Sequence, residues 1–245
     1  EGAGDMSSLA LISDIHGNRL ALRATLDDIR GQHVDATYCL GDLVGYGPDP
    51  NGVIELLRAR SIPSILGNYD EGIGWETGDC GCFYPDEEAR RIGEVSYAFT
   101  VAEVTAEGKA YLRSLPRELH VALAGKAVHL VHGSPRRINE YLSRDRDERT
   151  YLRLAEAEAD DALCFGHTHD PRSRRYGGKL FVNAGSVGRP KDGDTRAAYV
   201  VLKSVPAGPI EVEIRRVAYD VEAAARAVVA AGLPASLADM LRHGH

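Results

Sequence analysis

The sequence predicts an α/β protein of one domain, with two packed sheets and helices on the outside. Apolar strands alternate with amphipathic helices over residues 9–66, the pattern of a βαβ unit with a parallel sheet. From residue 118 onward short apolar runs follow one another closely and indicate further strands. No internal repeat or low-complexity linker divides the chain, so a single domain is expected over residues 9–231.

The first half begins with a short buried strand over residues 9–13. Asn18 is a good helix cap, and apolar residues recur behind it at helical spacing as far as Ile29. Two more strands are expected over 36–40 and 62–66. Between these two strands the composition predicts a loop over 45–50 and a helix from Val53 to Arg60.

The rest of the chain is less regular. Residues 71–86 are rich in glycine and acidic residues, which predicts a long loop that caps the site. Further helices are expected over 87–100, 105–114, 147–158 and the alanine-rich segment 221–231. Further strands are expected over 118–123, 126–131, 162–165, 172–176, 179–183, 197–202 and 210–216.

The composition limits the partners that the protein can have. Hydrophobic residues make up 44% of the chain and charged residues 27%, as in globular proteins. The net charge of -7 comes without a basic stripe, so binding to duplex nucleic acid is not expected. A small anionic substrate stays possible, because bound metal ions can dominate the local field.

Targeting signals are not evident. No apolar run reaches the roughly 20 residues that span a bilayer, so no membrane partner is expected. Residues 1–8 lack the pattern of a signal peptide and are expected to be disordered or vector-derived. The four cysteines do not suggest a disulfide framework, and Cys80 and Cys82 have no second pair with which to form a zinc knuckle. The expected location is cytoplasmic.

Polar side chains that can bind metal ions follow five of the expected strands. They are Asp14 and His16, Asp42, Asn68, His132, and His167 and His169, in chain order. Open α/β sheets place their sites at the carboxyl ends of strands, and a glycine beside each ligand position permits close backbone approach. One such residue alone is usually part of a turn. Together, two carboxylates, one amide and four imidazoles predict a metal site for Mn, Fe, Zn or Ni, without the thiolates of a structural zinc site.

The same residues resemble a known family. Asp14-Ile-His16, Gly41-Asp42, Gly67-Asn68, His132 and Gly166-His167-Thr-His169 resemble the five blocks of the calcineurin-like metallophosphoesterase superfamily. The stretch from Asn183 to Pro190 is similar to one in its small bacterial phosphodiesterase members. The resemblance implies a four-layer α/β/β/α sandwich and two divalent metal ions. It assigns one ion to Asp14, His16 and His169, the other to Asn68, His132 and His167, and makes Asp42 the bridge.

The implied reaction is hydrolysis of a phosphodiester or phosphoanhydride bond in a small phosphorylated molecule or nucleotide. Two cations would carry about +4 against about -2 from Asp14 and Asp42, which would attract phosphate. They would also lower the pKa of a bridging water, so that hydroxide forms near neutral pH.

Two departures from the family pattern bear on the substrate. Tyr69 stands where the family usually has a histidine that contacts phosphate and assists the leaving group. With a reference pKa near 10, a tyrosine offers a neutral hydrogen-bond donor in place of an imidazolium. After Gly41-Asp42 the chain also lacks the Asp-Arg-Gly stretch of protein phosphatases of this superfamily, which favours a small substrate.

Tyr69 and Asp42 are therefore the candidate catalytic residues, and Asn68, Arg189 and Asn18 the candidate substrate contacts. Asn18 is fully explained as a helix cap, and Arg189 is named by its place in the resemblance. The alternative activities are those of a dinucleoside polyphosphate hydrolase or a protein phosphatase. The alternative from another class is a metal-binding scaffold protein with little activity.

Overall fold

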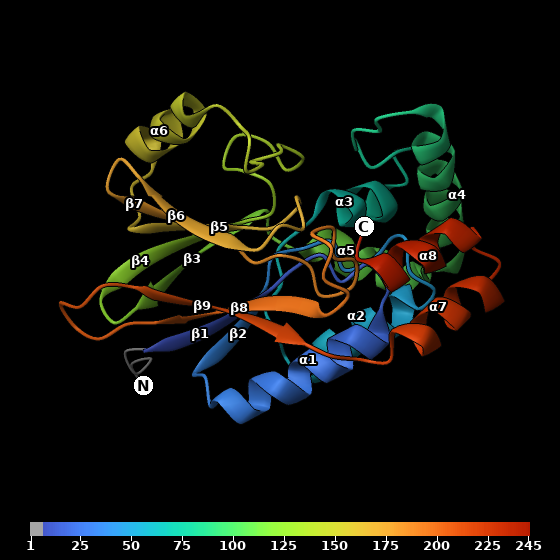
Figure 1. The fold of residues 1–245 in the computed structure, drawn as a ribbon, viewed down its shortest axis with the longest axis horizontal. Helices are drawn as coiled ribbons and strands as arrows, with labels where there is room; N and C mark the ends of the chain where they lie inside the picture. The colour runs from blue at the N-terminus through green and yellow to red at the C-terminus, as the bar shows by residue number, and fades with distance from the viewer. Residues whose placement is uncertain (1–6) are drawn as a thin grey trace.

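The computed structural model describes residues 7–245, so the expectation for residues 1–8 lies almost wholly outside the described chain. Two mixed sheets pack face to face, with helices on their outer sides, as the sequence predicts (Figure 1). The first sheet has the order β2-β1-β8-β9 and contains β1 (Ser8–Ile12), β2 (Ala36–Cys39), β8 (Ala197–Lys203) and β9 (Glu211–Val217). The second has the order β3-β4-β5-β7-β6 and contains β3 (Glu118–Leu123), β4 (Lys126–Val131), β5 (Ala162–Phe165), β6 (Arg172–Tyr176) and β7 (Lys179–Asn183).

Helices cover the outer faces of both sheets and one end of the sandwich. They are α1 (Arg19–Gln32), α2 (Pro50–Ala59), α3 (Asn68–Trp75), α4 (Glu87–Glu103), α5 (Ala106–Ser114), α6 (Glu148–Ala157), α7 (Val221–Ala230) and α8 (Ala235–His243). Figure 1 shows α1 under the first sheet and α6 above the second. The α4, α7 and α8 helices stand together beyond the end of the sheets (Figure 1).

The alternation of side chains along β1 explains the layered core. Leu9 and Leu11 point into the apolar layer between the sheets, where they join residues of β4, β5 and β7. Ala10 and Ile12 point to the other face and join the layer under α1 and α2. Because successive side chains of a strand face opposite sides, one apolar strand supplies two cores.

The strand expected over 62–66 is reduced to a single parallel bridge between Cys39 and Ser64. Pro63 has no N–H to donate, so the segment cannot continue a ladder. Its carbonyl still accepts from the Cys39 N–H at 2.9 Å, and the Ile65 N–H donates to the Cys39 carbonyl at 2.9 Å. The segment therefore runs beside β2 and still delivers Asn68 to the end of the sheet.

The loop expected over 71–86 is wrong in its first part, because α3 continues to Trp75. The Gly67 N–H donates to Asp70 Oδ2 at 3.0 Å, which caps the start of the helix. Gly72 serves close packing here, since a Cβ at this position would lie 2.6 Å from the Asp79 carbonyl oxygen. The α8 helix was not predicted from the sequence, although Leu237 and Leu241 are one helical turn apart and both are buried.

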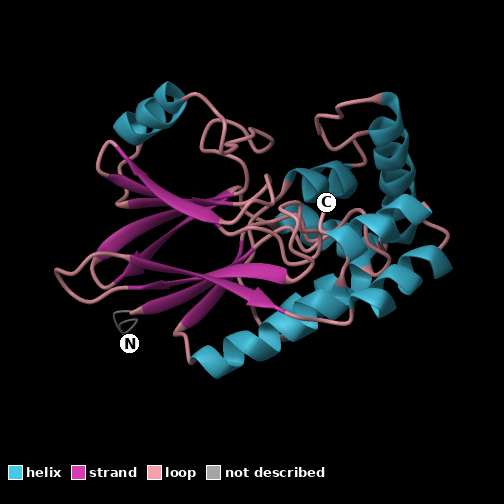
Figure 2. Ribbon diagram, viewed as in Figure 1, coloured by secondary structure: helices cyan, strands magenta, loops and turns pink. Residues whose placement is uncertain are grey.

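The loops at the carboxyl ends of the strands gather at one end of the sandwich, between the sheets and the end helices (Figure 2). In the first sheet β1 and β2 are parallel, and in the second β4, β5 and β7 are parallel. Parallel strands bring their carboxyl ends to the same edge. In the part of the chain that the structure describes, no helix is long and apolar enough to cross a bilayer.

Candidate metal centre

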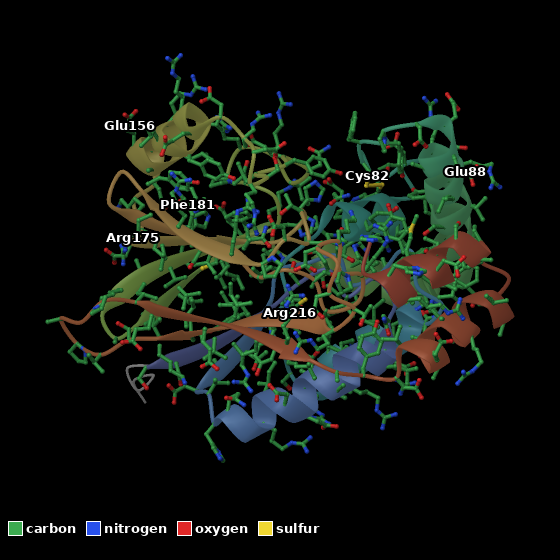
Figure 3. All side chains as sticks on the ribbon, viewed as in Figure 1. Cys82, Glu88, Glu156, Arg175, Phe181 and Arg216 are labelled. Atoms are coloured by element: carbon green, nitrogen blue, oxygen red, sulfur yellow. A yellow bond between two sulfur atoms is a disulfide. The ribbon has the colours of Figure 1, made fainter. Side chains whose placement is uncertain are left out.

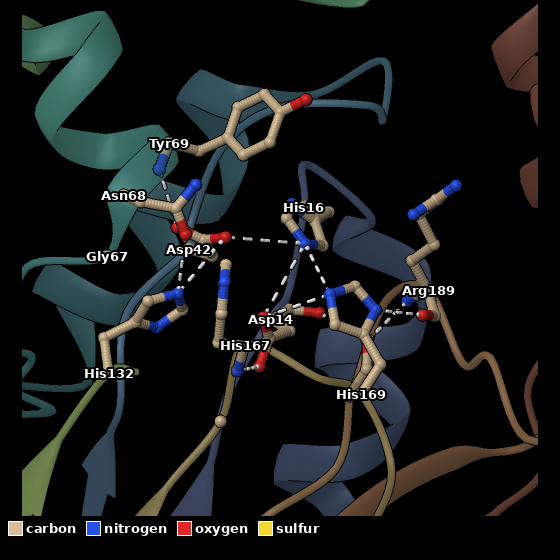
Figure 4. Close-up of polar contacts among 12 residues, drawn as sticks. Asp14, His16, Asp42, Gly67, Asn68, Tyr69, His132, His167, His169 and Arg189 are labelled. Atoms are coloured by element: carbon tan, nitrogen blue, oxygen red, sulfur yellow. Dashed lines mark hydrogen bonds and ion pairs between the residues drawn. The ribbon is translucent and has the colours of Figure 1, made fainter. Parts of the chain in front are cut away.

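All seven predicted ligand residues lie together at this end of the sandwich. Six of them form two groups whose ligand atoms lie within 4.8 Å of one another: Asp14, His16 and His169, and Asp42, His132 and His167. The seventh, Asn68, places its Oδ1 2.9 Å from the Nε2 of His132 in the second group. Figure 4 shows the two groups side by side.

The first group is drawn together across the two sheets. His169 Nε2 lies 3.1 Å from Asp14 Oδ1 and 3.2 Å from His16 Nε2. The second carboxylate oxygen of Asp14, Oδ2, accepts the backbone N–H of His167 at 2.9 Å. Asp14 therefore keeps one oxygen on the backbone and turns the other to the imidazoles.

Asp42 lies between the groups. Its Oδ2 is 3.7 Å from His16 Nε2 and 3.5 Å from His132 Nε2, one imidazole of each group. Its Oδ1 accepts the backbone N–H of Tyr69 at 2.8 Å, which fixes the carboxylate plane. A carboxylate in this position can contribute to both groups.

Contacts at Nδ1 orient three of the imidazoles so that their Nε2 atoms can bind a metal ion. The Nδ1 atoms of three rings lie against backbone carbonyl oxygens: His16 at 3.1 Å from Val44, His132 at 2.7 Å from Leu40, and His169 at 2.5 Å from Arg189. A proton on Nδ1 leaves each Nε2 with a free lone pair, the usual arrangement of metal-binding histidines. The facing Nε2 atoms of His16 and His169 then repel each other unless a cation lies near both.

Two buried acceptor atoms also indicate that a cation binds here. Asp14 Oδ1 and His167 Nε2 are buried and have no hydrogen-bond partner among the described residues. A buried polar atom without a partner costs about 1–3 kcal/mol. Oxygen and imidazole acceptors that converge without a donor fit a divalent cation of the Mn, Fe, Zn type.

Burial favours the neutral form of three of the four imidazoles. It lowers the pKa of His16 to about 3, and it lowers the pKa of His169 well below the usual range, with help from the charges of Lys191 and Arg189. Burial also lowers the pKa of His167 well below its usual range. These imidazoles are neutral near pH 7, which is the form that binds metals. Burial acts in the same direction on His132, but the carboxylate of Asp42 outweighs it and raises the pKa of His132 to about 9.

Five ligand residues have left-handed backbone conformations. Their φ angles are 52° at Asp14, 50° at His16, 54° at Asp42, 64° at His167 and 58° at His169. Residues other than glycine rarely adopt such angles, and those that do cluster at functional sites. The left-handed turns let His167 and His169, which are separated by one residue, direct their side chains to different ligand groups.

Glycines beside the ligands are required by close approach, as the sequence predicts. A Cβ on Gly67 would lie 2.1 Å from the Asp42 nitrogen and 2.2 Å from Asp42 Oδ1. A Cβ on Gly166 would lie 2.5 Å from Asp14 Oδ2. These distances are far below van der Waals contact, so any larger residue would displace the carboxylates.

The Asn68 side chain is oriented by the segment that follows α3. Its Nδ2 donates to the Cys80 carbonyl at 2.9 Å and to Cys82 Sγ at 3.2 Å, which turns Oδ1 toward His132. A disulfide joins Cys80 and Cys82, near the label in Figure 3. The sequence gives no signal for this bond. Cys39 and Cys164 are free and buried.

Tyr69 is buried, and its ring packs against His16 with centroids 5.4 Å apart and against Tyr46 at 4.8 Å. In Figure 4 its hydroxyl points away from the ligand atoms of both groups. Burial, followed by the neighbouring phenols of Tyr46 and Tyr84, raises the pKa of Tyr69 well above its usual value. The hydroxyl is therefore neutral, as the sequence analysis expects.

The other two candidate substrate contacts differ in how much of their side chain is free. Asn18 caps α1 by accepting from the Ala21 N–H at 3.1 Å, and its Nδ2 donates to the Gly188 carbonyl at 3.0 Å. Arg189 lies next to His169 in Figure 4, with its guanidinium carbon 4.1 Å from the centre of the Tyr46 ring. Its Nε is buried and has no partner in residues 7–245. Arg189 has donors left for an anion, whereas Asn18 is occupied.

Sequence reasoning missed residues that hold the ligand loops. Asp70 accepts from the Leu43 N–H at 2.9 Å with one carboxylate oxygen and from Gly67 with the other, so it ties two ligand loops together. Tyr141 lies against His167, with ring centroids 4.1 Å apart. Asp70 directly follows Asn68-Tyr69, and that position was its only signal. No pattern marked Tyr141.

The chain resembles proteins with a metal-dependent activity. A profile of the calcineurin-like phosphoesterase superfamily domain matches residues 7–205. An uncharacterized protein of Methanocaldococcus jannaschii is 32% identical over 253 aligned positions, which cover 96% of this chain and 97% of that protein.

Solved structures agree over nearly the whole length. The crystal structure of a metallophosphoesterase from Sphaerobacter thermophilus has a TM-score of 0.78 at 31% identity, covering 98% of this chain and 100% of that one. The crystal structure of a hypothetical protein from Pyrococcus horikoshii OT3 shares the fold, with a TM-score of 0.84 at 23% identity and coverage of 98% and 99%.

Proposed function

The chain belongs to the calcineurin-like phosphoesterase superfamily and is a metal-dependent phosphoesterase, and on this premise we propose the bond that it cleaves. The proposed reaction is hydrolysis of a phosphodiester or phosphoanhydride bond in a small phosphorylated molecule or nucleotide. The proposed cofactor is a pair of divalent metal ions, one for each group of ligands.

The position of Asp42 carries this proposal. Its Oδ2 lies 3.7 Å from an imidazole of the first group and 3.5 Å from one of the second, which suits a ligand shared by two ions. Asp14, His16 and His169 would hold one ion, and Asn68, His132 and His167 the other. Two bound cations supply Lewis-acid stabilisation of phosphate charge and a coordinated water of lowered pKa.

The chain's own residues would orient the substrate. Arg189 lies beside the first group, next to His169 in Figure 4, and its guanidinium can donate to a phosphate oxygen. Lys191 lies on the same loop and, when protonated, adds a second positive charge near a bound phosphate. Tyr69 offers no charge to a leaving alkoxide, so good leaving groups such as aryl oxides and phosphates are favoured.

The experiment that tests the proposal is a substrate panel with matched metals. Purified protein is loaded with Mn²⁺, Fe²⁺, Zn²⁺ or Ni²⁺, or treated with chelator, and assayed on aryl phosphomonoesters, aryl phosphodiesters, dinucleoside polyphosphates and a phosphopeptide. We expect metal-dependent turnover of aryl diesters or anhydrides, with phosphopeptide the poorest substrate. Elemental analysis should find two metal ions per chain.

Asp42→Asn and His132→Ala are the matched variants, because both weaken metal ligation without removing apolar core. We expect both to abolish turnover and to keep the folded circular dichroism spectrum. Near wild-type rates at saturating metal in either variant would reject the assignment. Metal binding without turnover of any panel member would favour the scaffold alternative.

A further inference from the structure

A cavity of about 300 Å³ opens beside the first ligand group, between the start of α1 and the two C-terminal helices. We call it the α7–α8 pocket. One wall is apolar and comes from α7 and α8: Ala224, Ala227, Val228, Leu237 and Leu241. The opposite wall comes from α1 and from the loops that carry His16, Tyr46 and Gly188-Arg189.

We propose that the α7–α8 pocket binds the apolar organic group of the phosphate ester whose phosphorus lies at the metal-ligand groups. This inference rests on the proposed function and names the substrate class: esters with a ring-sized apolar group, aryl or nucleobase. The size fits, since small-molecule pockets begin at about 300 Å³ and are lined mainly by apolar side chains.

The pocket is continuous with the candidate metal centre through two residues. His16 is a ligand of the first group and also lines the pocket. Arg189 lines the pocket too, and its carbonyl oxygen accepts a hydrogen bond from Nδ1 of the ligand His169 at 2.5 Å. A molecule whose phosphate lies at the metal ligands can therefore place its organic group in the adjoining pocket.

The polar atoms of the pocket favour an anionic ligand with an apolar group. The Nε atoms of Arg19 and Arg189 are both buried without a partner in the described chain, and both residues line the pocket. Arg23 adds a third positive charge at the exposed edge. The carboxylate of Asp49 lies near one of these arginines, with its Oδ2 3.4 Å from Arg19 Nη1. A neutral apolar ligand would not pair with these positive charges.

The apolar wall belongs to a part of the chain beyond the family match, which ends at residue 205. The α7 and α8 helices pack on each other through Ala225, Val228, Leu237 and Leu241, and Ile92 of α4 joins them. They stand beside α1 and apart from the sheets (Figure 1). The ligand groups are complete without these helices, so the helices are available to select the organic group.

Binding of non-hydrolysable phosphonates to the metal-loaded protein tests the pocket directly. Isothermal titration calorimetry compares methylphosphonate with 1-naphthylmethylphosphonate and with a thymidine 5′-phosphonate. We expect at least one ring-bearing ligand to bind about tenfold or more tightly than methylphosphonate, the effect of burying a ring in an apolar pocket. The tighter of the two shows whether the natural group is aryl or nucleoside.

Ala227→Phe fills the pocket from α7, and Ala230→Phe places the same side chain on the exposed face of that helix. We expect Ala227→Phe to remove the preference for ring-bearing ligands and leave methylphosphonate binding within about twofold. Ala230→Phe should behave as wild type. Leu20→Asp, at the exposed edge of the pocket, is a second variant with little risk to folding, and it should weaken the ring-bearing ligands selectively.

Equal affinity for all three phosphonates would overturn the inference, as would an unchanged preference in folded Ala227→Phe and Leu20→Asp. The substrate panel separates this failure from failure of the proposed function. Turnover of panel substrates together with equal affinity for the three phosphonates rejects the pocket alone. Ring-selective binding that Ala227→Phe removes, without turnover of any substrate, rejects the proposed reaction and leaves the pocket as a ligand site.

Discussion

Replacement of Gly67 by alanine tests how tightly the ligand loops are packed. A Cβ at this position would lie 2.1 Å from the Asp42 nitrogen and 2.2 Å from Asp42 Oδ1. Relief of this overlap requires the two backbones to separate by about 1 Å or more, given the usual contact distances of nonbonded atoms. The separation would move Asp42 and Asn68 apart, and these belong to the same ligand group.

The magnitude follows from that displacement. A misplacement of about 1 Å at a reacting centre reduces activity by roughly 10²-fold, which we expect in kcat/KM for Gly67→Ala. Overpacking of this kind costs about 1–3 kcal/mol of unfolding free energy, and each kcal/mol lowers Tm by about 2–4 °C in a domain of this size. The assays are steady-state kinetics on an aryl phosphodiester, metal titration and thermal unfolding of the metal-free protein.

Gly31→Ala is the matched control. Gly31 is an exposed glycine near the end of α1, and a Cβ there meets no atom of residues 7–245 within 4 Å. Alanine should stabilise the helix by about 0.5–1 kcal/mol and leave kinetics unchanged. Wild-type metal affinity and wild-type kcat/KM in Gly67→Ala would refute the claim that this contact positions Asp42.

Two further predictions concern stability, and a third concerns metal removal. Asn18→Ala should lower the unfolding free energy by about 2 kcal/mol in urea denaturation, because it removes the α1 cap and the donor to the Gly188 carbonyl; a loss below about 0.5 kcal/mol would contradict this. The hydrogen bond of His120 to Asp160 at 2.7 Å, with lesser help from Glu118 and Glu158, raises the pKa of His120. A raised pKa stabilises the fold below the unfolded value and ceases to do so as pH rises through the folded value, so His120→Gln should destabilise at pH 5.5 and have little effect at pH 9. Chelation should lower Tm reversibly, and readdition of Mn²⁺ should restore it, whereas equal Tm values would argue against a resident metal.

Much of this architecture could be predicted because its signals are local. Most of the strands from β3 to β9 contain short apolar runs between turn residues, and each ligand lies within a few residues of a strand end or of a glycine. Parallel pairing then brings the strand ends together without further information. The order of residues along the chain was enough to predict which loops carry the ligands.

The two errors have different causes, one in tertiary packing and the other in a single residue of the segment itself. The glycines of α3 indicated a loop, but Gly72 is needed because the Asp79 carbonyl approaches the helix. The segment 62–66 reads as a strand, yet Pro63 limits it to one bridge. The α7–α8 pocket was not predictable, because it forms between residues about 200 positions apart in the sequence, such as Arg23 and Val228.

The left-handed backbone turns at the ligands lower the stability of the fold that contains the metal centre. Each such non-glycine residue costs on the order of 1–3 kcal/mol, and five of the seven ligands are in this conformation. A domain has only about 5–15 kcal/mol of net stability, so the centre consumes a sizeable share of it. Selection for heat resistance and selection for catalysis therefore act against each other at the same few positions. In this family the conflict should appear as inactive variants that melt at higher temperatures than the active enzyme when metal is withheld.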